Sequence, residues 1–272
     1  FKEKRVQAFL HSGNLGDVIW SLPFIISRGG GDLYLKNSNP MSAVSEQYVN
    51  LYKILTAQPY IRKVILYSAV YGNKEVYTEG AKIGTINPTK EVEYDLNIEL
   101  DYDLDYFRLS PGLRKEHLIT SYFRVNKVDF PDTMPMPYLF VKNDFQFTNE
   151  KLNDIIKIPK AKYNVFQITQ RYRCEFDWEE LINSQTEKNY FVGIKSEYDE
   201  IIKDYKVKDK LEHLITKDMY DLALIIKNAN KFYCNPSVGH ALAVAMNKEF
   251  SLVVHPEQQD VRTGLPIENI IN

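Results

Sequence analysis

Cysteine is scarce in this sequence, which has only Cys174 and Cys234 among its 272 residues. Two thiols are too few for a disulfide framework, and neither they nor the five histidines show the spacing of a metal site or of a nucleophilic catalytic pair. The chain also lacks the apolar run of about 18 residues that a transmembrane helix needs. Its charged start, residues 1–5, is unlike a signal peptide. We therefore expect a protein of the reducing cytoplasm without a transmembrane segment.

An excess of charge of either sign is lacking as well. The formal net charge is −2 and the isoelectric point is about 6.3. No bulk field therefore draws the chain to nucleic acid or to an anionic membrane. With 272 residues, 44% of them hydrophobic, the chain is long enough for one large domain or for two ordinary domains, each with its own core.

The common phosphate-binding fingerprints are missing from the most distinctive turn of the N-terminal half. The residues from His11 to Pro23 contain Gly13-x-x-Gly16, which is neither the Gly-x-Gly-x-x-Gly of dinucleotide-binding folds nor a Walker loop. The two glycines still let the backbone turn tightly and approach a ligand closely. Spacing alone is equally compatible with an ordinary strand-to-helix turn.

The surroundings of this turn favour an anion site. A strand is predicted over residues 5–10 and a helix over 18–26, where apolar residues recur near helical spacing. A strand, a glycine turn and a helix in this order point the free N–H groups of the helix at an anion. Asp17 falls in the first helical turn, where it is either a functional acid or a residue that compensates the helix dipole.

Short strands alternate with helices along the rest of the chain, which predicts an α/β fold with mostly parallel sheets. Residues 142–159 mark the boundary between an N-terminal domain (1–147) and a C-terminal domain (148–272). We expect two Rossmann-like domains that face each other across a cleft, with ligands at the carboxyl ends of the strands. The predicted strands are 32–35, 63–67, 94–106, 138–141, 164–168, 190–194, 214–215, 231–234 and 251–254. The predicted helices are 42–55, 116–125, 149–158, 177–185, 197–205, 219–229 and 239–246, and residues 71–88 are predicted to form a loop.

The most regular stretch, residues 94–106, alternates apolar with acidic or polar side chains, as a strand with one acidic face does. It contains Asp101-Tyr-Asp103 and Asp103-Leu-Asp105. In one architecture of sugar-transferring enzymes such triplets hold a divalent metal. The further ligands that a hard cation needs are not identifiable in the sequence, so a solvated strand face is the favoured interpretation.

A second strand-to-helix turn precedes the apolar helix of residues 239–246. The residues that reach this helix N-terminus are Asn235, Ser237, Val238, Gly239 and His240. Such a turn suits a phosphate or a diphosphate. The alternative is a routine turn in which Ser237 is an N-cap and His240 is a packed, hydrogen-bonded histidine.

Charged residues also follow two of the predicted C-terminal strands. Arg171 and Arg173 come after residues 164–168, where a guanidinium can clamp a diphosphate, and Glu197 comes after residues 190–194. The alternatives are a solvated loop for the two arginines and a first-turn helix acid for Glu197.

Together the two turns resemble motifs of the heptosyltransferases, glycosyltransferase family 9, which have the two-domain GT-B fold. The run Gly13-x-Leu15-Gly16-Asp17-Val18, followed by Leu22-Pro23, looks like the N-terminal motif of that family. Residues 222–230 with Asn235-x-Ser237-x-x-His240-x-x-Ala243 look like its C-terminal donor-site motif. Residues 94–100 also resemble the family's strand ahead of the acceptor side, which supports the solvated interpretation of the Asp-x-Asp triplets.

The resemblance implies an inverting glycosyltransferase that needs no cofactor and no divalent metal. The C-terminal half would bind a nucleotide sugar, and the N-terminal half would bind a glycan or a lipopolysaccharide-type, lipid-linked glycan, in the cytoplasm or at the periphery of the inner membrane. Asp17 aligns with the acid proposed as general base, which takes the proton of the acceptor hydroxyl as that hydroxyl attacks the anomeric carbon. The donor contacts that the resemblance and the flanking charges suggest are Ser12, Gly13, Asn14, Arg171, Arg173, Glu197, Asn235, Ser237, Val238, Gly239 and His240.

Departures from the family pattern leave the donor open. Asn235 stands where the family commonly has Asp, and Pro236-Ser237 stands where it has Thr-Gly or Ser-Gly. Pro236 offers no backbone N–H to a diphosphate. Arg171 and Arg173 stand near the position of a residue that is usually Lys. ADP-heptose is therefore not assumed as the donor.

Three other functions remain open at this point. A phage-type glycosyltransferase that modifies hydroxylated DNA bases would use the same donor site, but the isoelectric point of about 6.3 disfavours a nucleic-acid partner. A non-catalytic scaffold that binds nucleotide sugars would keep the GT-B fold without the chemistry. A nucleotide-sugar epimerase would convert free donor with no acceptor present.

Overall fold

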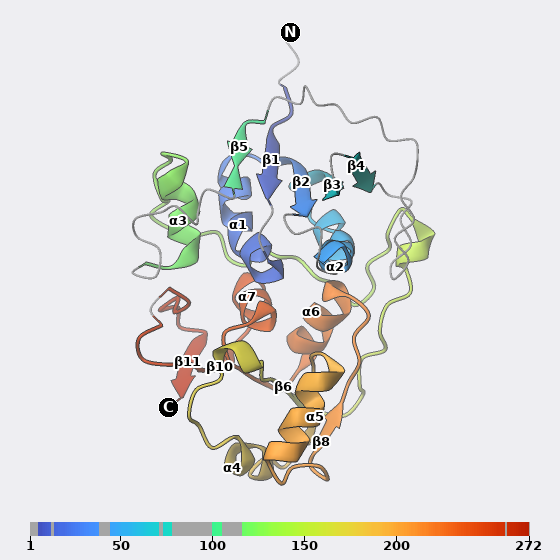
Figure 1. The fold of residues 1–272 in the computed structure, drawn as a ribbon, viewed down its shortest axis with the longest axis vertical. Coiled ribbons are helices and arrows are strands. Elements are labelled where there is room, and N and C mark those ends of the chain that lie inside the picture. The colour runs from blue at the N-terminus through green and yellow to red at the C-terminus, as the bar shows by residue number, and fades with distance from the viewer. Residues whose placement is uncertain are drawn as a thin grey trace.

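The chain folds into two α/β units, each built on its own sheet (Figure 1). The computed structural model describes residues 5–11, 14–37, 44–70, 73–77, 100–104, 116–258 and 260–271. Parallel strands with flanking helices were predicted for both halves, and this fold class is confirmed. None of the described helices is long and apolar enough to cross a membrane.

The N-terminal sheet has the strand order β4-β3-β2-β1-β5. Its strands are β1 (Ala8–His11), β2 (Gly31–Asn37), β3 (Ile61–Val70), β4 (Asn73–Tyr77) and β5 (Tyr102–Asp103), and all neighbours are parallel except β3 and β4. The helices of this unit are α1 (Leu15–Ser27), α2 (Val44–Thr56) and α3 (Leu118–Val125). The apolar residues of α1 from Val18 to Ile25 are buried, which is why helical spacing is so clear in the sequence.

The C-terminal sheet is fully parallel and has the order β11-β10-β9-β6-β7-β8. Its strands are β6 (Tyr163–Gln167), β7 (Lys188–Phe191), β8 (Leu211–His213), β9 (Lys231–Cys234), β10 (Phe250–Val253) and β11 (Glu268–Ile271). Its helices are α4 (Trp178–Asn183), α5 (Lys195–Asp204), α6 (Met219–Asn228) and α7 (Val238–Ala245). The strand order is that of a doubly wound fold, and the order reverses between β6 and β9. Ligands of such sheets bind at this switch point, outside the carboxyl ends of the strands.

Helices join the two units. In Figure 1, α1 of the first unit lies against α7 of the second, and α2 lies against α6. A buried ion pair crosses the second of these contacts, because the Lys53 ammonium of α2 lies 3.2 Å from a carboxylate oxygen of Asp218, the N-cap of α6. The two sheets are therefore held with the N-termini of α1 and α7 close together.

Residues 138–141 do not form the predicted strand. The backbone N–H groups of Tyr138 and Leu139 both donate to Ala245 O at the end of α7, and Phe140 exchanges two hydrogen bonds with the Gln58 side chain. Tyr138, Leu139 and Val141 are buried, whereas Phe140 is exposed, so the segment does not alternate as a strand with one buried face would. Its hydrogen-bond partners are a helix end and a side chain rather than a neighbouring strand.

The helix predicted over residues 149–158 is also wrong beyond its first turn. Only a 3-10 turn, Glu150–Leu152, forms there. The Asn153 side chain binds the backbone of Phe147, and Ile156 N donates to the Asp221 carboxylate at 3.0 Å. These contacts hold the rest of the segment extended along the second unit.

Other differences concern the edges of the sheets. Part of the predicted loop 71–88 is β4, which pairs with a β3 that is longer than predicted. The strand β11 was not predicted. Of the strand predicted over 94–106, the described residues contain β5, and residues 94–99 with Asp105 and Tyr106 lie outside them. The domain boundary at residues 147 and 148 stays a prediction.

Candidate functional site

A cavity of about 550 Å³ lies where the two units meet, at the switch point of the C-terminal sheet. The N-terminus of α1 forms one wall, and the N-terminus of α7 with the loops after β6 and β7 forms the other. Its lining contains these residues predicted from the sequence: Asn14, Asp17, Arg171, Glu197, Ser237, Val238 and His240. Ser12 and Gly13 lie outside the described residues.

The α1 wall is shaped by Gly16 and Asp17. A Cβ placed on Gly16 would lie 3.9 Å from Val238 Cα, so the two helix N-termini approach closely at this glycine. Asp17 is half-buried, and one of its carboxylate oxygens accepts the Asn14 N–H at 3.0 Å. The Tyr122 hydroxyl donates to Asp17 O at 2.7 Å and also contacts His11 Nε2 at 3.0 Å. Asp17 therefore combines the helix-capping role with a position on the cavity wall.

The α7 wall is a helix N-terminus at which a side chain from the end of β6 already accepts hydrogen bonds. Ser237 is the N-cap of α7, and its hydroxyl donates to Gln167 Oε1 at 2.6 Å. Gly239 N donates to the same oxygen at 2.8 Å, which removes one of the free N–H groups expected for an anion. Gly239 itself is buried and does not line the cavity.

The structure separates the two predicted arginines. Arg171 is exposed, lines the cavity and lies over the ring of Tyr172, with its guanidinium carbon 5.1 Å from the ring centroid. Arg173 does not line the cavity, and its guanidinium donates to Asp204 at 2.9 Å. Of the two, Arg171 is the one placed to meet an anionic ligand.

Glu197 lines the cavity from the first turn of α5. Burial raises the pKa of its carboxyl, although the backbone N–H groups of Ile194 and Gln170 donate to it. These two bonds tie the loop after β6 to the start of α5.

Asn235 connects strand ends rather than lining the cavity. Its amide oxygen accepts Thr169 N at 2.8 Å, and its amide nitrogen donates to Thr169 O at 2.7 Å. The side chain is fully buried. Asn235 therefore fixes the loop after β6 against the end of β9, which positions Thr169 and Arg171 at the cavity.

An aromatic contact spans the two units at the cavity wall. The Trp20 ring of α1 lies edge-on to the rings of His240 and His117, with centroid separations of 5.3 Å and 4.8 Å. Burial lowers the pKa of His240 to about 3, with a smaller effect from His117. His240 is therefore neutral at physiological pH, and it offers the cavity an imidazole rather than a cation.

His117 makes the folded chain sensitive to acid. Its Nδ1 accepts the Ile119 N–H at 3.2 Å and caps α3, and burial lowers the pKa of the ring to about 4. Below pH 6.5 the unfolded chain binds a proton that the folded chain does not hold until about pH 4, so stability falls as the pH falls. Between pH 7.5 and pH 5.0 we expect this group to remove about 2 kcal/mol from the free energy of unfolding.

Chemical denaturation at the two pH values measures this loss. His117→Asn retains an N-cap acceptor but does not titrate, so its stability should fall by about 2 kcal/mol less than that of the unmodified chain. His255→Asn is the matched control, because the exposed His255 Nδ1 accepts the Glu257 N–H in the same i to i+2 arrangement. Equal pH dependence for His117→Asn and the unmodified chain would contradict the assignment.

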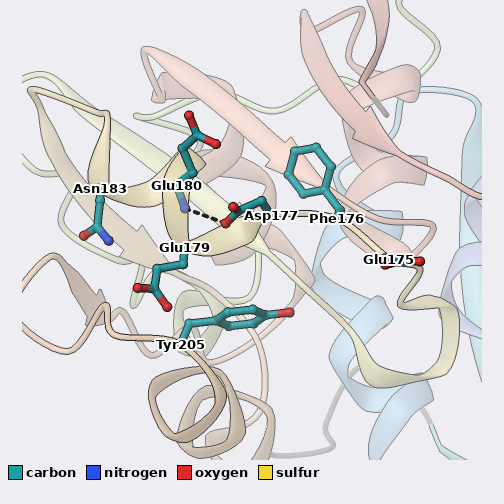
Figure 2. A pocket seen from close by; sticks show the side chains of 7 residues that line it. All are labelled: Glu175, Phe176, Asp177, Glu179, Glu180, Asn183 and Tyr205. Carbon is teal, nitrogen blue, oxygen red and sulfur yellow. Dashed lines mark hydrogen bonds between the residues drawn. The ribbon is translucent and has the colours of Figure 1, made fainter.

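A second hollow, of about 740 Å³, is larger than the cavity but has different chemistry. Figure 2 shows its lining beside α4, with the Glu180 N–H donating to the Asp177 carboxylate. The side chains in view are Glu175, Phe176, Asp177, Glu179, Glu180, Asn183 and Tyr205. Four carboxylates with no basic residue among them disfavour a diphosphate, so we place the candidate site in the smaller cavity.

The first carboxylate of the Asp-x-Asp stretch, that of Asp101, has a structural role. One Asp101 oxygen binds Arg5 and the other accepts Ala8 N, both at 2.8 Å, which anchors the edge of the first sheet. Among the described residues no group of three or more His, Cys, Asp or Glu is placed to hold a metal ion. Metal independence stays a prediction.

The sequence interpretation missed Gln167 and Trp20. Gln167 ends a strand whose other residues are mostly apolar, and a polar side chain at the carboxyl end of a buried strand is itself a signal of a ligand site. Trp20 lies within the apolar face of α1, where nothing in the pattern distinguishes a core residue from one at the cavity.

The fold is similar to that of solved glycosyltransferases. E. coli heptosyltransferase WaaC with ADP-2-deoxy-2-fluoro heptose matches with a TM-score of 0.55 and 12% identity over 97% of this chain and 92% of that chain. A glycosyltransferase family 9 protein from Veillonella parvula DSM 2008 matches with 0.56 and 11% over 100% and 87%. E. coli ADP-heptose lps heptosyltransferase II matches with 0.55 and 10% over 98% and 90%. No protein-family model and no curated protein matches the sequence. The predicted GT-B-type architecture is thus confirmed as a fold.

Proposed function

We propose that this chain is an inverting glycosyltransferase that moves a sugar from a nucleotide-sugar donor to an acceptor hydroxyl without a metal. The observation that carries the proposal is the cavity between the units, where Asp17 on one wall opposes Arg171 and the N-terminus of α7 on the other. A carboxylate and an anion-binding wall on opposite sides of one cavity are the two parts that this reaction needs.

The donor belongs on the C-terminal wall. The N-terminus of α7 carries the positive end of the helix dipole, and Arg171 adds a full positive charge beside it. Together they stabilise the negative charge that grows on the nucleoside diphosphate as it leaves. Neutral His240 adds hydrogen-bonding capacity without a further charge.

The acceptor belongs on the N-terminal wall, next to Asp17. The Asp17 carboxylate takes the proton of the acceptor hydroxyl as the hydroxyl oxygen forms a bond to the anomeric carbon. The bond from that carbon to the diphosphate breaks on the opposite face, with inversion of the sugar. The Asn14 N–H and the Tyr122 hydroxyl hold the residue in place during this step.

Two of the solved structures reported above have an ADP-linked heptose in their titles, and both are heptosyltransferases. Their architecture supports a nucleotide sugar as donor, and a glycan or lipid-linked glycan as acceptor. The low identity and the Pro236 departure leave the base and the sugar of this donor to experiment. The net charge of −2 makes a glycan a better acceptor than DNA.

A thermal-shift screen against ADP-, UDP-, GDP-, dTDP- and CMP-sugars, with and without EDTA, tests the donor site. One nucleotide sugar should raise the melting temperature in the presence of EDTA, because a ligand of the folded state stabilises it by mass action. Arg171→Ala should reduce affinity for that donor by about tenfold or more, since it removes a charged hydrogen bond. Arg173→Ala is the matched control and should leave affinity within about threefold, because Arg173 binds Asp204 outside the cavity.

The screen also has outcomes that contradict the proposal. If none of the donors raises the melting temperature, the assignment of a donor site to this cavity is wrong. If Arg171→Ala and Arg173→Ala lose the same donor affinity, Arg171 has no specific role in binding. A shift that disappears with EDTA would contradict metal independence.

A non-catalytic scaffold that binds nucleotide sugars is the second candidate, and the α7 wall supplies the observation that favours it. Pro236 has no N–H, and the Gly239 N–H is already bound by Gln167, so fewer backbone donors face a leaving diphosphate. Release of free sugar and nucleoside diphosphate from the bound donor distinguishes the two. A scaffold binds without turnover, whereas the proposed enzyme hydrolyses its donor slowly in the absence of an acceptor.

A further inference from the structure

Gln167 ends β6 at the switch point and occupies the centre of the α7 wall. Its side chain is 4% exposed and lines the cavity. Its Oε1 accepts both the Ser237 hydroxyl at 2.6 Å and Gly239 N at 2.8 Å. Because a backbone N–H can only donate, the atom facing Gly239 must be the amide oxygen, which fixes the orientation of the amide group.

In this orientation the amide nitrogen of Gln167, Nε2, makes no hydrogen bond within the described part of the chain. This nitrogen carries two N–H donors. A polar group in a nearly buried side chain normally has a partner, so an unpartnered amide on a cavity wall indicates a ligand atom that accepts from it.

The same contacts leave fewer hydrogen-bond donors on this wall that could bind a ligand. The Ser237 hydroxyl and the Gly239 N–H are both directed at Oε1 and are not directed at a ligand. A Cβ on residue 239 would lie 2.0 Å from that oxygen, so the arrangement requires glycine there. The Gly239 N–H is bonded to Gln167 Oε1 and is not free for a ligand. The amide nitrogen of Gln167 is therefore the hydrogen-bond donor that this wall offers in its place.

We propose that Gln167 contacts the donor directly, presenting Nε2 to an oxygen of its diphosphate while Oε1 holds the N-terminus of α7 in position. This inference rests on the proposed function, because it assumes that a nucleoside diphosphate binds in the cavity. It adds to Arg171 a neutral, directional donor that is fixed by the fold rather than by an exposed side chain.

Titration calorimetry with ADP, UDP, GDP, dTDP and CDP tests the contact in the unmodified chain and in Gln167→Glu. The glutamate keeps an acceptor for Ser237 and Gly239 but replaces the amide donor with a carboxylate oxygen. Affinity for the bound nucleotide should fall by at least about tenfold, while the ligand-free melting temperature stays within a few degrees. A residue that only held α7 in place would lose no more affinity than the added negative charge alone costs, which a control variant measures.

Asn50→Asp is the matched control, because Asn50 of α2 lines the same cavity and the substitution adds the same charge. It should weaken nucleotide binding by no more than about threefold, because the half-buried Asn50 lies on α2 rather than on the α7 wall, so its charge acts without a direct contact. An equal loss in both variants would mean that charge alone explains the effect, and would overturn the contact.

The outcomes separate this inference from the proposed function. If the unmodified chain binds none of the five nucleotides and no nucleotide sugar of the thermal-shift screen, the proposed function fails and the contact fails with it. If the unmodified chain binds one of them and Gln167→Glu binds it equally well, only the contact fails. Should Gln167→Glu not fold, the side-chain ¹⁵N–¹H₂ resonance of Gln167 in the unmodified chain decides instead. That resonance should move on addition of the nucleotide, and an unchanged resonance would overturn the contact.

Discussion

Asp17→Asn is expected to reduce the rate of sugar transfer by about 10²- to 10⁴-fold, the usual contribution of a general base. The asparagine oxygen can still accept the Asn14 N–H that the carboxylate accepts at 3.0 Å, so the start of α1 should be preserved. Donor affinity should change little, because Asp17 lies on the opposite wall from Arg171 and α7. The measurement is the steady-state rate with the donor and acceptor at saturation, together with a donor titration.

The alternative for Asp17 is a helix-capping acid with no chemistry. Loss of a first-turn charge alone costs about 0.3–1 kcal/mol of stability and leaves the rate almost intact. Glu180→Gln provides the matched control, because Glu180 is a first-turn acid of α4 and lies outside the cavity. An Asp17→Asn enzyme as active as Glu180→Gln would show that Asp17 only caps α1.

Lys53→Met is expected to lower the free energy of unfolding by about 3–5 kcal/mol, the range for a broken buried ion pair. The Lys53 side chain is 1% exposed, and its ammonium lies 3.2 Å from Asp218 and 3.9 Å from Asp221. It also donates to Asp154 O at 3.0 Å. Methionine fills a similar volume but leaves two buried carboxylates without their cation. Urea unfolding measures the loss.

The pH dependence of this loss identifies its cause. Burial and the neighbouring Asp218 raise the pKa of Asp221 above its ordinary value, and removing Lys53 raises it further. A carboxyl whose pKa is raised in the folded state binds a proton more readily there, so the deficit of Lys53→Met should shrink as the pH is lowered from 7.5 to 5.0.

Lys217→Met is the comparison for this prediction, because Lys217 pairs with Asp154 at the surface, where its side chain is 52% exposed. Its loss should be no more than about 1 kcal/mol. A loss of that size for Lys53→Met as well would contradict a charge-dependent contact between the two units.

The local parts of the fold were predictable because their signals are local. Apolar residues at helical spacing and a glycine turn identify α1, and the same kind of signal identifies α7 after β9. The rule that ligands bind at the carboxyl ends of parallel strands then brought Asp17, Arg171 and Ser237 to one cavity.

Segments whose partners are distant in sequence were not predictable in the same way. Residues 138–141 are apolar like a buried strand, but their backbone binds Ala245 and Gln58, and no pattern within the segment reveals those partners. Residues 153–158 read as helical, but Ile156 N donates to Asp221, which lies 65 residues further along the chain. Non-local hydrogen bonds overrule local propensity in both cases.

The hydrogen-bond partners of the residues around the cavity could not be predicted from the sequence either. Arg171 and Arg173 have equivalent positions after β6, and only the presence of Asp204 beside Arg173 distinguishes them. Asn235 and Gly239 were predicted to meet the donor, and the structure instead directs them to Thr169 and Gln167. The sequence predicted residues that line one cavity, whereas the hydrogen-bond network of those residues depends on the fold.

A crystal structure of the chain with the nucleoside diphosphate of its donor tests the central claim most directly. The account predicts the diphosphate between Arg171 and the N-terminus of α7, within hydrogen-bond distance of the guanidinium, with the Asp17 carboxylate on the facing wall. A nucleotide bound outside this cavity, such as in the acidic hollow beside α4, would contradict the account.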